Sequence, residues 1–218
     1  MSAPTTLLFA RHGNTFAPGD KVVWVGRGTD LPLVQRGYEQ AEAAARFLAG
    51  PDLAPSGIVC GRLQRVRAFA DILGARLGVA VRFDPGLDEI DYGAWEGLSS
   101  DEIRALPGGA AAMEEWRHHD RWPENAGWGS SRDDVLAALK GVLDGVLTGG
   151  DGARPLLISS NGVLRFAPLI LAATGGGPYQ MATGTLSAVD RDARGWTVRF
   201  WGVAPDEKSP APHKGGAG

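Results

Sequence analysis

A histidine preceded by an arginine directly follows the first apolar segment of the chain, in the run Arg11-His12-Gly13-Asn14-Thr15. A neutral imidazole can attack a phosphorus atom, and a guanidinium group can bind two phosphate oxygens through parallel hydrogen bonds. A turn with two more arginines, Gly61-Arg62-Leu63-Gln64-Arg65, follows the second apolar segment. These residue types in these positions predict an arginine-rich phosphate pocket around His12.

Two other segments carry groups that such a pocket would use. A carboxyl group can protonate a leaving alkoxide and then take a proton from water. The acidic and aromatic segment at residues 87–97 offers four candidates, which are Asp88, Glu89, Asp91 and Glu96. The turn Ser160-Asn161-Gly162, with Arg165 after it, adds a hydroxyl, an amide and helix N-terminal N–H groups, all of which can bind an anion.

Strands that alternate with amphipathic helices must position these groups. Short apolar runs bounded by turn residues predict strands at residues 6–10, 57–60, 155–159 and 186–190, with weaker candidates at 79–83 and 196–201. Three-four spacing predicts helices whose buried faces hold Tyr38, Ala41, Ala45 and Leu48; Leu63, Val66, Ala70, Leu73 and Leu77; and Val135, Leu139, Val142 and Val146. In the apolar stretch 163–173, Pro168 predicts a kink or the true helix start.

This alternation predicts a mainly parallel sheet with helices on both faces. Ligands bind beyond the carboxyl ends of the strands in such sheets, so the polar turns should meet at one rim. The 218 residues, 44% of them apolar, fit one domain, which we place at residues 1–204. Residues 88–128 are interpreted as a lid or substrate segment within it, and residues 205–218 as a disordered tail.

The net charge, the apolar runs and the cysteine content limit which partners and which location can be expected for the chain. A net charge of −3 gives no reason to expect nucleic acid or an anionic membrane surface. No apolar run approaches the roughly 20 residues of a membrane span, and the first residues do not resemble a signal peptide, so a cytoplasmic location is expected. The single cysteine, Cys60, lies in an apolar run and is predicted to be a buried core residue. The sequence carries no signal for an oligomeric state.

From about residue 7 to residue 165 the chain resembles the histidine phosphatase superfamily, also called the phosphoglycerate mutase-like family. One motif of this kind is weak, whereas four in the family's order are specific. They are Arg11-His12-Gly13-Asn14-Thr15, which is similar to Arg-His-Gly-x-Thr; Asp30-Leu31-Pro32-Leu33 with Gly37 and Gln40-Ala41; Leu63-Gln64-Arg65, similar to Leu-x-Arg; and residues 87–93 with Trp95-Glu96-Gly97, similar to the acid-bearing segment.

The resemblance implies a three-layer α/β/α sandwich and phosphoryl transfer through a phosphohistidine on His12. Arg11 and Arg65 would keep the imidazole neutral and bind the phosphate, and Glu89 would act as general acid and then as general base. Motif position favours Glu89 over the three other carboxylates. The remaining phosphate contacts would come from Asn14, Thr15, Ser160 and Asn161. No metal and no cofactor would be needed, and the substrate would be a small phosphorylated metabolite.

The chain departs from the family where a second histidine is expected, because alignment on Gly162 and Arg165 places Ser160 there. Loss of one donor beside a transferring phosphoryl group typically costs about 10²–10³ in rate. A slow phosphatase is therefore one reading, and a non-catalytic phosphate-binding or regulatory protein is another. A phosphomutase is a third, although no extra basic segment is evident in the lid. Ser160 could also cap the helix that follows it.

Other conspicuous residues have less specific readings. Trp95, Trp116, Trp122 and Trp128 could line a pocket for an apolar or sugar-like substrate, or pack the lid onto the sheet. His118 and His119 are adjacent, so their side chains diverge on a helix, and a solvated lid is favoured over a metal site. Either histidine could instead reach into the pocket from the lid. Arg62 and Arg67 are interpreted as surface charges.

Overall fold

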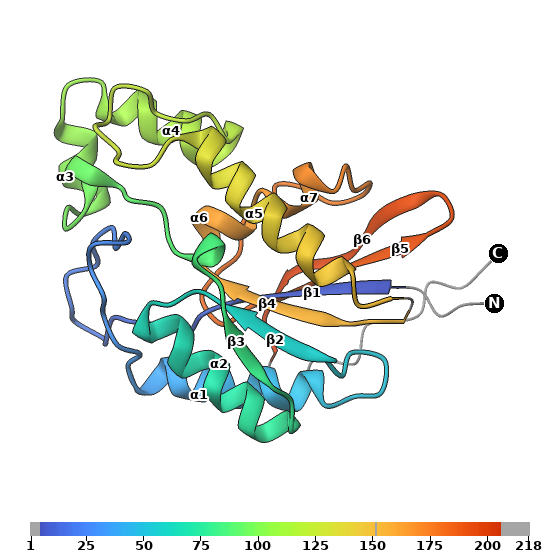
Figure 1. The fold of residues 1–218 in the computed structure, drawn as a ribbon. Coiled ribbons are helices and arrows are strands. Elements are labelled where there is room, and N and C mark those ends of the chain that lie inside the picture. Colours follow the sequence, from blue (N-terminus) through green and yellow to red (C-terminus); the bar gives the residue numbers. More distant parts are fainter. Residues whose placement is uncertain (1–4, 151, 206–218) are drawn as a thin grey trace.

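A computed structural model describes residues 5–150 and 152–205 of the chain. It contains a six-stranded sheet in the order β3-β2-β4-β1-β5-β6 (Figure 1). Strands β3, β2, β4 and β1 are parallel, while β5 and β6 form an antiparallel extension beside β1. This confirms the predicted mainly parallel sheet. The strands are Thr5–Arg11 (β1), Gly57–Cys60 (β2), Val81–Phe83 (β3), Pro155–Ser159 (β4), Leu186–Asp192 (β5) and Gly195–Val203 (β6).

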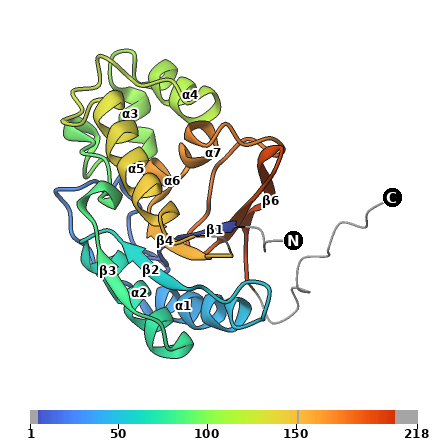
Figure 2. The same ribbon diagram turned by 45° about the vertical axis from the view of Figure 1, so that its right-hand side comes forward.

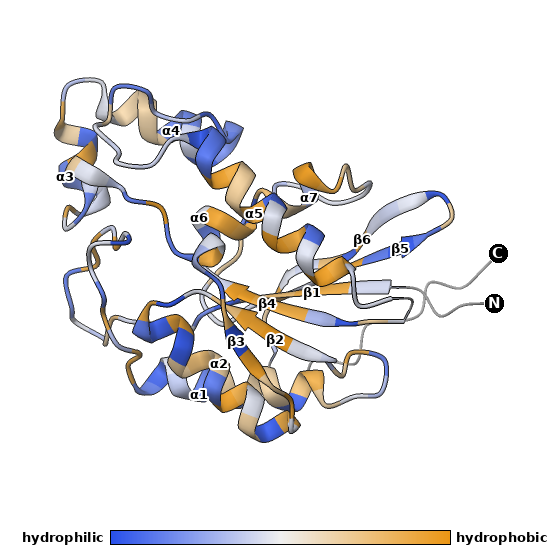
Figure 3. Ribbon diagram, viewed as in Figure 1, coloured by the Kyte–Doolittle hydropathy of each residue, from blue (hydrophilic) through white to orange (hydrophobic). Residues whose placement is uncertain are grey.

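Helices cover both faces of the sheet, as predicted. Helices α1 (Gln35–Leu48) and α2 (Gln64–Leu77) lie on one face, and α5 (Arg132–Leu147) lies on the other with the short α6 and α7 (Figures 1 and 2). A separate buried cluster fills each of the two interfaces. The central strands β1, β2 and β4 are mostly apolar on both sides because both sides are covered, and the helices turn their polar faces outward (Figure 3).

Helix α1 is rotated about its own axis relative to the prediction, so a different set of its residues faces the core. Its buried residues are Gly37, Ala41, Ala44, Ala45 and Leu48, whereas Tyr38 is 43% exposed, so the placement of Tyr38 on the buried face was wrong. The cause is the neighbouring Gly37, whose backbone packs directly against the backbone of Gly13. That close approach places the smallest residue inward and turns Tyr38, about 100° further around the helix, toward solvent.

The apolar stretch after β4 forms two short helices, α6 (Asn161–Leu164) and α7 (Ala167–Ile170). Pro168 lies in the first turn of α7, where its missing N–H would have no partner in any case, so it marks a helix start as predicted. Cys60 is fully buried, and burial raises the pKa of its thiol to about 12, which fits an inert core residue.

Residues 88–128 form an irregular layer beyond the carboxyl ends of the parallel strands (Figure 1). A 3₁₀ turn at Pro85–Leu87 (η1) leads into it, and the layer contains a second 3₁₀ turn at Gly93–Trp95 (η2), then α3 (Ser100–Ala105) and α4 (Gly109–His119). Ser99 and Glu102 cap α3 reciprocally. We call residues 88–128 the lid segment.

Of the predicted tail, only Pro205 lies within the described residues. None of the helices at residues 5–150 and 152–205 has the length and hydropathy needed to cross a bilayer.

Gly13 should tolerate no side chain. A Cβ there would come within 2.5 Å of the Gly37 carbonyl oxygen and 2.6 Å of its Cα, and neither backbone atom can move without shifting α1. We expect Gly13→Ala to lower the free energy of unfolding by about 1–3 kcal/mol, measured by urea denaturation. Gly141→Ala is the matched control, because its methyl group meets open space inside α5 and should stabilise by about 0.5–1 kcal/mol. Equal stabilities for the two variants would contradict this reading.

Candidate active site

A cavity of about 660 Å³ lies beyond the carboxyl ends of β1 and β4, between the sheet and the lid segment. All the predicted site residues except Ser160 line it, which are Arg11, His12, Asn14, Thr15, Arg65, Glu89 and Asn161. They come from segments far apart in sequence because parallel strands bring their carboxyl ends to a single edge. The rim predicted from the turns is therefore present, and its residues line one cavity that is open to solvent on one side.

The tautomer of His12 follows from its one hydrogen bond. Its Nδ1 lies 2.8 Å from the carbonyl oxygen of Gly13, which can only accept, so Nδ1 carries the hydrogen. In the neutral ring Nε2 is then unprotonated and is the nucleophilic atom. Burial lowers the pKa of His12 well below its usual value, and the positive charges of Arg11 and Arg65 lower it further. The imidazole therefore stays neutral at physiological pH.

Arg11 and Arg65 are held by neutral carbonyl groups. Arg65, buried in the first turn of α2, donates from Nη1 to Thr29 O at 2.9 Å and from Nη2 to Gly26 O at 3.3 Å. Arg11 donates from Nη1 to Met181 O at 2.7 Å, while its buried Nε has no partner among the described residues. Because these acceptors carry no charge, both guanidinium groups keep a full positive charge for an anion in the cavity.

Glu89 is buried beside these cations. Its Oε1 accepts from the Ile90 N–H at 2.9 Å and from the Tyr92 hydroxyl at 3.3 Å. Burial raises the pKa of Glu89, although the charge of Arg65, the nearby Ser160 hydroxyl and the hydrogen bond from the Ile90 N–H partly oppose that rise. Both donors go to Oε1, so Oε2 is the oxygen that can carry the proton of the acid form.

The other three carboxylates of this segment are engaged elsewhere. Asp88 accepts from the Arg62 backbone N–H at 2.7 Å and from its guanidinium at 2.9 and 2.5 Å. Asp91 Oδ1 accepts from Gly93 N at 2.9 Å, and the Glu96 carboxylate packs against Gly26 and Gly28. Among the described residues that line the cavity, Glu89 is the one carboxylate. The side chain of Arg62 is 61% exposed, and the exposed Arg67 stacks on the Phe83 ring, as expected for surface charges.

Ser160 is buried behind the cavity, with 1% exposure. It directly precedes α6, but its hydroxyl makes no capping hydrogen bond, so the capping interpretation was wrong. The hydroxyl is directed at the carboxylate of Glu89 and lowers its pKa, without reaching a regular hydrogen-bond geometry. Asn161 next to it lines the cavity and accepts from the Met181 N–H at 2.7 Å. A direct contact of Ser160 with phosphate stays a prediction.

The lid segment contributes Arg117, which the sequence did not single out, and Trp116, for which pocket lining was one of the two expectations. Trp116 and Arg117 of α4 line the cavity, whereas His118 and His119 are exposed and do not reach in. Within the part of the chain that the structure describes, no group of three or more metal-ligating side chains occurs. Trp95, Trp116, Trp122 and Trp128 pack edge-to-face against one another, with ring centroids 4.8–5.7 Å apart, and of these four only Trp116 also lines the cavity.

Arg165 joins the turn after β4 to the lid segment. Its Nη2 donates to the carbonyl of Trp116 at 3.0 Å and forms an ion pair with Asp120, at the C-terminal end of α4. Its guanidinium also stacks on the Trp116 ring at 4.4 Å. A buried cation from the core thus caps a lid helix, where the negative end of the helix dipole favours positive charge.

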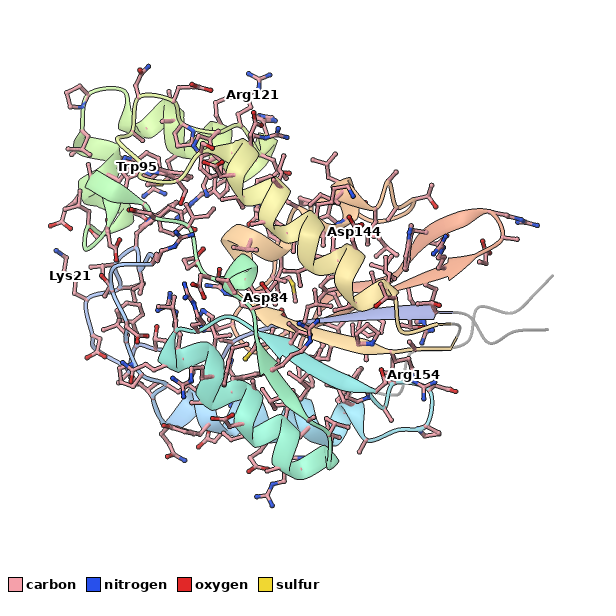
Figure 4. All side chains as sticks on the ribbon, viewed as in Figure 1. Lys21, Asp84, Trp95, Arg121, Asp144 and Arg154 are labelled. Carbon is pink, nitrogen blue, oxygen red and sulfur yellow. The ribbon has the colours of Figure 1, made fainter. Side chains whose placement is uncertain are left out.

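The loop between β1 and α1 forms another wall of the cavity, and its Trp24 contacts the lid segment, where Nε1 donates to Ser100 Oγ at 3.3 Å. Its cavity-lining residues are Phe16, Ala17, Pro18, Val22, Val23, Trp24 and Val25. Lys21 of this loop reaches Glu102 of α3 at 2.7 Å and ties the loop to the lid segment (Figure 4). These wall residues could not be predicted from periodicity, because the loop has no regular secondary structure.

Comparison with known proteins identifies the family to which the fold belongs. The model of the histidine phosphatase superfamily (branch 1) matches residues 7–204. The bifunctional protein Rv2228c of Mycobacterium tuberculosis is 34% identical over 160 residues, which are 72% of this chain but 41% of that protein. This chain thus spans less than half of that relative.

The match to this chain covers a larger share of two further relatives. A glucosyl-3-phosphoglycerate phosphatase of Mycolicibacterium vanbaalenii is 33% identical over 166 residues, or 72% of this chain and 69% of that protein. The native structure of mycobacterial glucosyl-3-phosphoglycerate phosphatase Rv2419c superposes with a TM-score of 0.73 and 26% identity, covering 91% of this chain and 99% of that one. With His12, Arg11, Arg65 and Glu89 gathered in one cavity and this match over nearly its whole length, the chain belongs to the histidine phosphatase superfamily.

Proposed function

We propose that this protein is a phosphatase that hydrolyses a small phosphomonoester through a phosphohistidine on His12. The observation that carries the proposal is the Nδ1–H···O=C bond of His12, which leaves Nε2 unprotonated in a cavity that Arg11 and Arg65 also line. The similarity to a glucosyl-3-phosphoglycerate phosphatase supports hydrolysis as the reaction class. It does not extend to the identity of the metabolite.

In the first step, Nε2 of His12 attacks phosphorus in line with the ester oxygen. The N–P bond forms as the P–O bond breaks, and the Oε2 proton of Glu89 passes to the leaving alkoxide. In the second step, the Glu89 carboxylate takes a proton from water, whose oxygen attacks phosphorus. The N–P bond then breaks, inorganic phosphate leaves, and Nε2 and the acid form of Glu89 are restored.

Arg11 and Arg65 would stabilise the equatorial oxygens of the transferring phosphoryl group in both steps. Arg11 has a buried Nε with no partner among the described residues, which is the kind of donor a bound phosphate would satisfy. Because guanidinium groups supply the positive charge, we propose that the reaction needs no metal ion. Asn14, Thr15 and Asn161 line the same cavity and would complete the phosphate contacts, with Ser160 acting behind them.

A non-catalytic phosphate-binding protein is the second candidate, and Ser160 favours it. If the alignment on Gly162 and Arg165 holds, the buried hydroxyl of Ser160 would occupy the position of the family's second histidine, and one donor beside the transferring group would be missing. The pocket of Arg11 and Arg65 would bind an anion even without turnover. The two candidates therefore differ in chemistry and share their ligand.

The deciding experiment incubates the wild-type protein with an aryl phosphate in the presence of a chelator, and measures both product and phosphoenzyme. We expect steady release of phosphate together with a phosphate adduct that peptide mass spectrometry assigns to His12. Binding of phosphate or vanadate without product or adduct would support the non-catalytic candidate. Transfer of the phosphoryl group to a second alcohol in preference to water would indicate a phosphomutase.

Arg65 should set the pH range of the first step, which needs neutral His12 and protonated Glu89. Its charge lowers the pKa of both residues, so Arg65→Gln should raise both values and move both limbs of the kcat/KM profile to higher pH. The maximum should fall about 10²–10³-fold. Arg67→Gln, an exposed change two residues along α2, is the control. An unshifted profile for Arg65→Gln would contradict this role.

A further inference from the structure

The Ser160 hydroxyl is a buried polar group without a regular hydrogen bond. The residue is 1% exposed, and its Oγ has no partner among residues 5–150 and 152–205. A donor that is removed from water and left unpaired costs free energy, so such a group calls for an acceptor at some stage of the protein's work. Two acceptors come into question at this place, the Glu89 carboxylate and an anion bound in the cavity.

The side chain of Ser160 lies behind the cavity wall. The two residues that follow it, Asn161 and Gly162, line the cavity, whereas Ser160 is not among the lining residues. Its backbone is held there because its carbonyl oxygen accepts from the Leu164 N–H at 3.0 Å, in the first turn of α6. A phosphate in the cavity is therefore not the acceptor that this geometry favours.

The first turn of α6 is in direct contact with the Glu89 carboxyl group. A Cβ on Gly162 would lie 2.5 Å from Glu89 Oε1 and would also meet the Tyr92 hydroxyl, so there is no room for a water molecule between this turn and the carboxyl. The Ser160 hydroxyl is close enough to lower the pKa of Glu89. A small rotation of the side chain would complete a hydrogen bond to the carboxylate, because a hydroxyl hydrogen turns freely about its C–O bond.

The two forms of Glu89 differ in their need for a further donor. Oε1 already accepts from the Ile90 N–H at 2.9 Å and from the Tyr92 hydroxyl at 3.3 Å. These two donors suit the neutral acid, whose Oε2 carries the proton. Once that proton has passed to the leaving group, a buried carboxylate bears a full negative charge, and a third donor stabilises it. Ser160 can supply that donor until water attacks.

The other charged or titratable groups around Glu89 do not replace this donor. Within the described residues they are Arg11 and His12 after β1, Arg65 in α2, Tyr92 in the lid segment and, acting on Tyr92, Arg165 after α6. Arg11 and Arg65 donate to backbone carbonyls and lower the pKa of Glu89 through their charge. The Nδ1 hydrogen of His12 is directed to the Gly13 carbonyl. A phosphoryl group on His12 would draw on the charge of both arginines, so the Ser160 hydroxyl is the donor that Glu89 does not share with phosphate.

We propose that Ser160 is a positioning residue for the general acid and base, whose hydroxyl donates to the Glu89 carboxylate between the two chemical steps. In the second step the carboxylate takes a proton from water on Oε2, and the hydrogen bond from Ser160 is released as Glu89 becomes neutral again. The inference rests on the proposed function for these steps. Ser160 would then act through Glu89 and make no contact with the phosphoryl group.

Carbon-13 NMR of the full chain, labelled at the glutamate carboxyl carbons, tests the contact without turnover. The Glu89 signal is the one that is missing in Glu89→Gln. Ser160→Ala should move the titration midpoint of Glu89 to higher pH, because only the ionised form loses a donor. Ser160→Cys should do the same, since its thiol fills the space, keeps water out and donates weakly.

Kinetics should show the same change if the protein hydrolyses phosphomonoesters. The alkaline limb of the kcat/KM profile should move to higher pH, while the acid limb, set by His12, should stay in place. Below the titration of Glu89, hydrolysis of the phosphoenzyme should slow about five- to tenfold, as the loss of one hydrogen bond to a charged group allows. Residues that merely support the fold would lower rates without moving one limb alone.

Ser159→Ala is the matched control. Ser159 is the adjacent residue and is fully buried, but its hydroxyl donates to the Leu87 carbonyl at 2.6 Å. Its loss should lower the free energy of unfolding and leave the titration of Glu89 as in the wild type. Vanadate should bind to Ser160→Ala within about twofold of the wild-type affinity, measured where Glu89 is protonated in both proteins.

The outcomes separate this inference from the proposed function. An unchanged Glu89 titration in both Ser160 variants would overturn the inference, even in a protein that forms the phosphohistidine. So would a loss of vanadate affinity of about tenfold or more without a moved titration, because the hydroxyl would then contact the anion. A moved titration in a protein that forms no phosphohistidine would support the contact between Ser160 and Glu89 while the proposed hydrolysis fails.

Discussion

His12→Ala should reduce hydrolysis of an aryl phosphate by about 10⁴–10⁶-fold, because the variant lacks the atom that forms the covalent intermediate. Binding should persist, since Arg11 and Arg65 are held by carbonyl groups and do not depend on the imidazole. Initial rates under saturating substrate measure the first effect, and competition by inorganic phosphate or vanadate measures the second.

A control is needed because His12 is buried and its loss could disturb the turn. His119→Ala removes an exposed histidine of the lid segment and should leave both rate and binding as in the wild type. The thermal unfolding midpoints of the two variants show whether either change perturbs the fold. Full activity of a folded His12→Ala protein would exclude the phosphohistidine route.

Glu89→Gln should lower the rate about 10²–10⁴-fold for alkyl phosphates, whose leaving oxygen requires a proton. The glutamine amide oxygen can still accept from the Ile90 N–H and the Tyr92 hydroxyl, so the side chain should stay in place. The formation rate of the phosphoenzyme should fall much less with a nitrophenyl phosphate, because its leaving group departs as a stable anion. The informative quantity is the ratio of the phosphoenzyme formation rates with the two substrates, measured in single turnovers.

Asp88→Asn provides the comparison for this experiment. Asp88 is adjacent in sequence and buried, but it pairs with Arg62 and does not line the cavity. The rate of Asp88→Asn relative to the wild type should be the same for the alkyl phosphate and the nitrophenyl phosphate. If Asp88→Asn reproduced the leaving-group dependence while Glu89→Gln did not, the two carboxylates would have to exchange roles.

The layers of the fold could be predicted because local patterns and tertiary packing agree in most elements. Strands β1 and β4 are continuous apolar runs covered on both faces, and α5 carries its apolar residues at helical spacing. Tyr38 was misplaced because a contact between two backbones, Gly13 and Gly37, decided the rotation of α1. Periodicity within one helix contains no information on such a contact.

The phosphate end of the site could be predicted because its residues directly follow strands, where topology alone gathers them. The contribution of Arg117 to the cavity wall could not be predicted. Arg117 lies inside a helix next to two exposed histidines, and nothing in its spacing distinguishes it from a solvated charge. Its position depends on how α4 packs against Arg165, and hence on contacts between residues 48 or 49 positions apart in the chain.

The anchoring of α4 by Arg165 restricts which lids could be grafted onto this core. A transplanted segment must supply two backbone carbonyls at a helix end and an acidic side chain after them, as Trp116, Arg117 and Asp120 do here. Without them the buried guanidinium would lose its counter-ion, a loss that typically costs about 3–5 kcal/mol. Designs that redirect this scaffold to new esters should therefore retain the C-terminal turn of the helix and vary the residues before it.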